Sequence, residues 1–155
     1  MSSDAAIRVL FVCTGNSARS QMAEALLEHL GGSDFDVESA GSQPKGVNAY
    51  TIRVLAERGI DWSGAESKSV HGFTDREWDY VITVCDRARQ VCPVFPGGYD
   101  SLHWDLDDPA EVAGTDEEKL AAFRSTVTEL TQRLRPFVEA ALRAAGRAPR
   151  SIVAG

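Results

Sequence analysis

One stretch near the beginning of the chain, AIRVLFVCTGNSARSQMAEALLEHLGG (residues 6–32), decides the fold. Ala6–Cys13 is a continuous apolar run, which is typical of a strand buried on both faces of a parallel sheet. After a short polar loop, apolar residues recur at helical spacing from Met22 to Leu30, and a Gly-Gly pair ends the pattern. The stretch therefore predicts a buried strand, a loop, and a helix that opens at Ser20.

The rest of the chain continues this alternation of strands and helices. The further strands are predicted at Phe35–Gly41, Trp78–Cys85 and Ser101–Leu106. The further helices are predicted at Asn48–Ile60 and Asp116–Gly146, with a bend or break at Pro136. This order predicts an α/β fold, an open parallel sheet with helices on both faces, which binds ligands beyond the carboxyl ends of its strands. We expect one domain over residues 1–155, with 147–155 as a flexible tail.

Composition limits the kind of partner. With 155 residues, 43% hydrophobic and 25% charged, the chain has the make-up of an ordinary globular protein. Its net charge of -7 argues against nucleic acid or an anionic membrane as a partner, because both select basic surfaces. There is no long apolar run and no leader, and the 3 cysteines suit a reducing compartment, so we expect a cytoplasmic protein. We also expect a monomer.

The loop after Cys13 wraps the N-terminal end of the predicted helix. Backbone N–H groups in such a loop can form a nest for a tetrahedral oxyanion. The predicted oxyanion-binding residues are Thr14, Gly15, Asn16, Ser17, Ala18, Arg19 and Ser20. Gly15 permits the turn, Asn16 holds its shape, and Arg19 offers a planar fork for two anion oxygens. The arginine and the helix N-terminus favour a thiolate, so Cys13 is predicted to attack the bound anion, although an unreactive cysteine in a turn is the simpler alternative.

The other two cysteines lie in VCDRARQVCPVFPGG (residues 84–98). Cys85 ends a buried strand at the same sheet edge as Cys13 if the strands are parallel, and Cys92 lies in a Pro- and Gly-rich segment suited to moving. Three thiols placed in this way allow a disulfide relay. The pair could also be buried core residues. No C-x2-C or H-x3-H spacing supports zinc, so no metal is expected.

The opening stretch carries a family resemblance. VLFVCTGNSARSQMAEALL (residues 9–27) resembles the opening of the low-molecular-weight tyrosine phosphatase fold, and CTGNSARSQMAE (residues 13–24) is similar to the arsenate reductases built on it. A cysteine common in the family just before the arginine is replaced here by Ala18. The spacing of Cys85 and Cys92 resembles the redox pair of the thioredoxin-coupled arsenate reductases. The resemblance implies thioredoxin as partner and source of reducing equivalents, and no bound cofactor.

A leaving oxygen needs a proton, and HWDLDDPAEVAGTDEEK (residues 103–119) offers candidate carboxylic acids. The resemblance implies that the general acid is the aspartate directly before proline, Asp108. Asp105 and Asp107 are interpreted as solvated loop residues, and His71 and His103 as structural.

Two chemistries remain to be weighed on this fold. The phosphatases that the chain resembles carry an aromatic residue after SAG and another after Asp-Pro, whereas this chain reads SAGSQPKGVN (residues 39–48) and DPAEV (residues 108–112). This favours an arsenate reductase that uses Cys13, Cys85 and Cys92 in turn. A phosphatase, a reductase that uses a small external thiol, and a binding module without turnover stay open as alternatives.

Some of the resembling reductases bind potassium beside the cysteine loop. Asn16 and Glu24 match two of the ligands, but Lys68 stands where the acidic ligand is expected. We predict that the Lys68 ammonium occupies that space and that no potassium binds.

Overall fold

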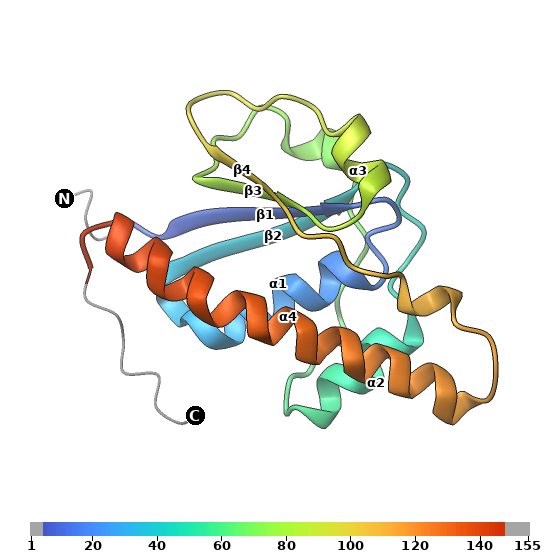
Figure 1. Cartoon of the computed structure of the whole chain (residues 1–155). Coiled ribbons are helices and arrows are strands. Elements are labelled where there is room, and N and C mark those ends of the chain that lie inside the picture. The colour runs from blue at the N-terminus through green and yellow to red at the C-terminus, as the bar shows by residue number, and fades with distance from the viewer. Residues whose placement is uncertain (1–4, 148–155) are drawn as a thin grey trace.

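The computed structural model describes residues 5–147 (Figure 1). The strands are β1 (Ile7–Cys13), β2 (Phe35–Gly41), β3 (Tyr80–Thr83) and β4 (Asp100–His103). The helices are α1 (Arg19–Gly31), α2 (Ala49–Glu57), α3 (Asp86–Val91) and α4 (Asp116–Ala144). Short 3-10 turns lie at Gly32–Asp34, Val70–Phe73 and Pro109–Glu111.

The sheet is open and entirely parallel, with strand order β2-β1-β3-β4. Helices α1 and α4 pack together on one face, with α2 against α4, and α3 lies on the other face against β1 and β3 (Figure 1). The predicted open parallel sheet with helices on both faces is confirmed. Because β1 and β3 are neighbours, the segments that follow Cys13 and Thr83 leave the sheet at the same edge.

Burial follows the pattern of the sequence. Strand β1 is covered on both sides, and Val9, Leu10 and Phe11 are fully buried. Helix α4 has a capping box between Thr115 and Glu118, and it turns one apolar face toward α1 and the sheet. The resulting core holds β1 rigidly, so the loop after Cys13 starts from a fixed point.

Three details differ from the sequence-based prediction. The segment Asp86–Val91, where no helix is predicted, is helix α3. Strands β3 and β4 are shorter than predicted, since the chain leaves the sheet after Thr83 and His103. Helix α4 runs through Pro136 without a break, because this residue is exposed and water can hydrate the carbonyl that its missing N–H leaves unpaired.

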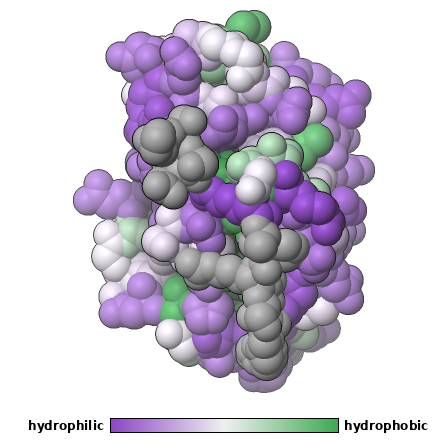
Figure 2. All heavy atoms as spheres, turned by 90° about the vertical axis from the view of Figure 1, so that its left-hand side faces the viewer, coloured by the Kyte–Doolittle hydropathy of each residue, from purple (hydrophilic) through white to green (hydrophobic). Residues whose placement is uncertain are grey.

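The face at the amino ends of the strands is mostly hydrophilic, with scattered hydrophobic residues (Figure 2). Of the helices in residues 5–147, none combines the length and the apolar character needed to cross a bilayer. The predicted flexible tail lies outside the described residues except for Arg147, which forms an ion pair with Asp34 at 3.4 Å and so belongs to the folded part.

Candidate active site

Cys13 is the last residue of β1 and is 2% exposed. Its Sγ lies 2.8 Å from Oγ of Ser20, in the first turn of α1. Ser20 Oγ also accepts a hydrogen bond from Asn16 Nδ2 at 2.8 Å, so its own hydroxyl hydrogen is free to point at the sulfur. This charge-assisted hydrogen bond is suited to a thiolate at Cys13.

The loop after Cys13 is held from outside through its carbonyl oxygens. Backbone N–H groups of residues 42–48 donate to four of them at 2.8–3.3 Å. The carbonyls held in this way belong to Cys13, Thr14, Gly15 and Ser17. The carbonyl of Asn16 accepts a 2.6 Å hydrogen bond from the Ser67 hydroxyl. In a trans peptide the N–H points away from the preceding C=O, so the N–H groups of residues 14–18 are directed to the opposite side, where an anion can lie.

Asn16 holds the loop in shape. It is the one described residue other than glycine with a positive φ, 46°, and it is completely buried. Its Nδ2 donates to Ser20 and to Ser39 Oγ (2.9 Å), while Oδ1 accepts from Gln21 Nε2 (2.9 Å) and from the Lys68 backbone N–H (2.8 Å). Asparagine tolerates this left-handed conformation better than most residues, and here all its side-chain groups are bonded.

Arg19 and Asp108 meet at the rim of the loop. Nη2 of Arg19 lies 3.5 Å from Oδ2 of Asp108, and Nη1 donates to the Leu106 carbonyl at 3.1 Å. Asp108 also accepts a hydrogen bond from the Ala110 N–H, which positions it at the start of the 3-10 turn Pro109–Glu111. Cys13, Arg19 and Asp108 line one pocket of about 300 Å³. The predicted nucleophile, anion-binding fork and general acid thus share a single cavity.

The sequence did not single out three residues that shape this cavity. Lys45 and Gln43 line it, and Lys45 adds a second positively charged side chain to that of Arg19. A Cβ on Gly41 would lie 2.5 Å from the Thr14 carbonyl, so only glycine allows the loop to approach the end of β2. In the sequence, the one indication of a special role for Gly41 is its position at the end of a predicted strand.

Cys85 lies beside the loop. It is 5% exposed, it precedes α3, and its Sγ is 3.4 Å from Oγ1 of Thr14, the residue next to Cys13. The structure therefore brings Cys85 to the edge of the Cys13 loop, as the parallel sheet predicts.

Cys92 lies apart from this loop, at the other end of α3. It lines a separate hollow with Thr83, Tyr99 and His103, none of which belongs to the cavity around Cys13. Its thiol is half-buried, and burial raises its pKa to about 11. With α3 folded, Cys92 is accordingly a protonated thiol that does not contact the predicted nucleophile.

Lys68 occupies the place predicted for it. Its Nζ lies 3.3 Å from Glu24 Oε1 and 3.2 Å from Glu38 Oε1. Glu24 also accepts a 2.6 Å hydrogen bond from Ser39, the serine bound by Asn16. Burial raises the pKa of Glu24, and the Ser39 hydrogen bond and the Lys68 ammonium oppose that shift. The absence of potassium remains a prediction.

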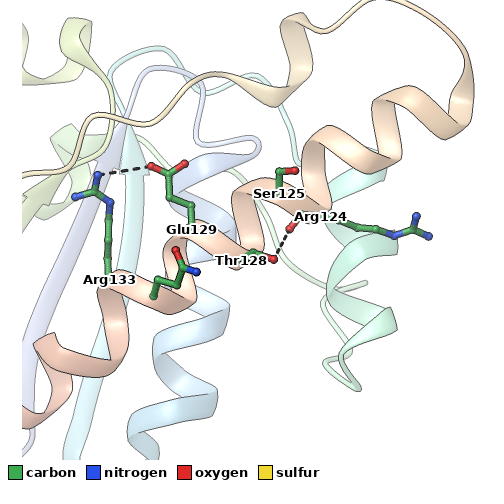
Figure 3. Close-up of a pocket in the computed structure, with 6 residues that line it drawn as sticks. Arg124, Ser125, Thr128, Glu129 and Arg133 are labelled. Atoms are coloured by element: carbon green, nitrogen blue, oxygen red, sulfur yellow. Dashed lines mark hydrogen bonds and ion pairs between the residues drawn. The ribbon is translucent and has the colours of Figure 1, made fainter.

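The remaining candidates lie outside the cavity. His71 is exposed in the 3-10 turn Val70–Phe73, while Asp105 and Asp107 are exposed after β4. A larger hollow lies on the solvent side of α4, where Arg133 forms an ion pair with Glu129 at 3.6 Å (Figure 3). It holds no cysteine or histidine, and its arginines are engaged in ion pairs, Arg133 with Glu129 and Arg124 with Glu57 of α2, so we assign it no function.

The loop, the parallel sheet and the order of elements define a class of protein. Residues 8–148 match the model of the low molecular weight phosphotyrosine protein phosphatase family, and the chain belongs to this family.

Within the family the chain is similar to arsenate reductases. The arsenate reductase of Halalkalibacterium halodurans is 42% identical over 131 residues, covering 84% of this chain and 94% of that protein. A thioredoxin-dependent arsenate reductase from Corynebacterium glutamicum superimposes with a TM-score of 0.60 and 36% identity, over 85% of this chain and 63% of that one. The low molecular weight protein tyrosine phosphatase from T. tengcongensis gives a TM-score of 0.71 at 27% identity, over 87% and 99%. The fold is therefore shared by both activities, and the likeness in sequence is greater to the reductase relatives.

Proposed function

We propose that this protein is an arsenate reductase that uses three of its own thiols in succession. The observation that carries the proposal is the contact of Cys85 Sγ with Thr14, 3.4 Å away, which brings a second thiol to the edge of the predicted anion loop. A phosphatase needs no thiol there. The similarity to arsenate reductases over most of the chain supports the same activity.

In the first step the loop N–H groups and Arg19 bind arsenate, and the Cys13 thiolate attacks arsenic. A Cys13 S–As bond forms and an As–O bond breaks, while Asp108 gives its proton to the departing oxygen. Ser20 stabilises the thiolate before the attack, since its hydroxyl lies 2.8 Å from the sulfur. The product is a covalent adduct in which the sulfur of Cys13 is bonded to arsenic(V).

In the second step Cys85 attacks the sulfur of Cys13. The disulfide between them forms, the S–As bond breaks, and its electron pair reduces arsenic(V) to arsenic(III), which leaves as arsenite. In the third step Cys92 attacks Cys85, so that the Cys13 thiolate is released and the disulfide moves to Cys85–Cys92.

The third step requires α3 to unwind. Cys85 and Cys92 flank the six-residue helix, and seven steps of about 1.5 Å place their Cα atoms roughly 10 Å apart. A disulfide needs Cα atoms about 4.4–6.8 Å apart, so a rigid shift of the helix cannot form the bond. Unwinding also frees Cys92 from the burial that raises its pKa.

Thioredoxin is the proposed reductant of Cys85–Cys92. Val91 and Val94, 49% and 85% exposed, flank Cys92 and provide apolar surface for a protein partner. A structural relative is a thioredoxin-dependent arsenate reductase. All three thiols belong to one chain and must be reduced to act, so we propose a monomer in the cytoplasm.

The test measures arsenite release and NADPH oxidation by the protein with arsenate, thioredoxin, thioredoxin reductase and NADPH. The wild-type protein is expected to turn over continuously. Cys92→Ser is expected to release at most one arsenite per chain and then stop with a Cys13–Cys85 disulfide, detected by mass spectrometry.

The other outcomes identify the competing functions. Sustained turnover by Cys92→Ser with a small thiol would show a single-thiol reductase. Hydrolysis of an aryl phosphate at a rate indifferent to Cys85→Ser and Cys92→Ser, without arsenite release, would show a phosphatase.

A further inference from the structure

Outside the cavity, three side chains with metal-ligating atoms converge where β4 ends and α3 begins. Asp86 is the first residue of α3, His103 is the last residue of β4, and Asp105 follows two positions later. One carboxylate oxygen or imidazole nitrogen from each residue lies within 4.8 Å of those of the other two. They come from two segments that the fold brings together, rather than from one run of acidic residues.

The imidazole of His103 is oriented by a neighbour. Its Nδ1 lies 2.8 Å from Thr83 Oγ1, and the Thr83 hydroxyl donates to the Leu102 carbonyl at 3.4 Å. With that hydroxyl hydrogen engaged, Nδ1 can donate to Thr83 Oγ1, which leaves Nε2 for a ligand. Metal-binding histidines are typically fixed in this way, through the nitrogen that does not bind the metal.

The free nitrogen of His103 faces Asp86. Nε2 is buried and makes no hydrogen bond, although Oδ1 of Asp86 lies only 3.2 Å away. A protonated imidazole would donate a hydrogen bond to this oxygen. In a neutral imidazole protonated at Nδ1, the lone pair of Nε2 would face a lone pair of the Asp86 carboxylate, and the two would repel each other. Two ligands of one tetrahedral ion with bonds of about 2.0–2.1 Å lie roughly 3.3 Å apart. The spacing of the two atoms fits neighbouring ligands of a single cation.

We propose that Asp86, His103 and Asp105 bind a divalent transition-metal ion such as Zn²⁺. Imidazole nitrogen and carboxylate oxygen are both ligand types of this ion, and water completes the coordination. The ion ties the first turn of α3 to the end of β4. If the relay of the proposed function holds, this matters for its last step, because the bound ion opposes unwinding of the first turn of α3 and so favours the dithiol form.

The first experiment measures Zn²⁺ binding by calorimetry to the full chain with its cysteines replaced by serine, so that no thiol competes. One ion per chain is expected. His103→Gln and Asp105→Asn are each expected to weaken binding at least tenfold. Asp107→Asn is the matched control, since it removes an exposed carboxylate of the same segment that lies outside the cluster, and it should bind as the parent does. Equal affinity of His103→Gln and its parent would overturn the proposal.

The second experiment follows hydrogen exchange of the α3 amides in the same protein. When the free Zn²⁺ concentration is ten times Kd, amide exchange that requires release of the ion is expected to slow roughly tenfold. In Asp105→Asn at the same Zn²⁺ concentration, the exchange is expected to slow much less. No slowing would overturn the claim that the ion holds α3. If the cysteine-free chain does not fold, Mn²⁺ binding to the reduced wild-type protein, read by electron paramagnetic resonance, gives the same comparison. Neither measurement uses arsenate or thioredoxin, so the metal-site proposal can fail or succeed independently of the proposed function.

Discussion

Helix α3 separates two thiols of the proposed relay, so its stability sets their redox equilibrium. The helix is intact when the thiols are reduced and cannot be intact in a Cys85–Cys92 disulfide, whose Cα atoms must approach by several ångströms. The free energy of forming the helix is therefore part of the free energy of reducing the disulfide. A substitution that weakens α3 without touching either thiol should favour the disulfide.

Gln90 offers such a substitution, because it is exposed in α3 and lies between the two cysteines. Glycine is about 1 kcal/mol less favourable than alanine in a helix interior. Comparing Gln90→Gly with Gln90→Ala, we expect the equilibrium constant for disulfide formation to rise about fivefold in the glycine variant. Since about 1.4 kcal/mol corresponds to about 30 mV, the reduction potential should fall by roughly 20 mV.

The assay is a redox titration of both variants in a Cys13→Ser background, where only Cys85 and Cys92 can pair. Each protein is equilibrated in dithiothreitol buffers of graded potential, and the disulfide fraction is read by alkylation and mass spectrometry. Equal potentials for the glycine and alanine variants, or a higher potential for glycine, would refute the argument that α3 must unwind.

Three further predictions concern single residues. Ser20→Ala removes a hydrogen bond to the Cys13 thiolate and should slow single-turnover arsenite release at least tenfold. Thermal unfolding of the variant checks whether the slower release instead reflects a less stable fold. Potassium should raise activity and melting temperature no more than sodium does, since the Lys68 ammonium already lies 3.3 Å from Glu24; a potassium-specific rise would contradict this. The raised pKa of Cys92, about 11, should make the folded state lose stability as the pH rises from about 9 to 11. Over this range Cys92→Ala should lose less stability in urea unfolding, and parallel curves for the two proteins would count against the prediction.

Much of the site follows from the sequence because its geometry is local. A buried strand, a polar loop and a helix leave few ways to arrange residues 13–20, and the nest of N–H groups results from that connection. The meeting of Cys85 with the loop also follows, since the carboxyl ends of adjacent parallel strands share one edge.

The parts that were not predicted depend on contacts between distant segments. Lys45 lies in a segment that has no regular pattern, and Gly41 is marked in the sequence only as the end of a predicted strand, so nothing in their spacing indicates contact with the loop. Helix α3 was not predicted because six residues are too few for a helical period to show, and Asp86 in its first turn is the one indication in the sequence. The His103 cluster required the register of β4, which no sequence pattern provides.

The outward hydrogen bonds of the loop carbonyls have a consequence for selectivity. Residues 42–48 and Ser67 fix the shape of the loop before any anion binds. The entropic cost of ordering the loop is therefore part of folding and does not reduce the affinity for the anion. A rigid nest of this kind fits any tetrahedral oxyanion of similar size, and phosphate should compete with arsenate for it. Under the proposed function, discrimination between the two anions then lies in electronic structure rather than in shape: both reach Cys13, and only arsenic(V) accepts the electron pair when the second thiol attacks.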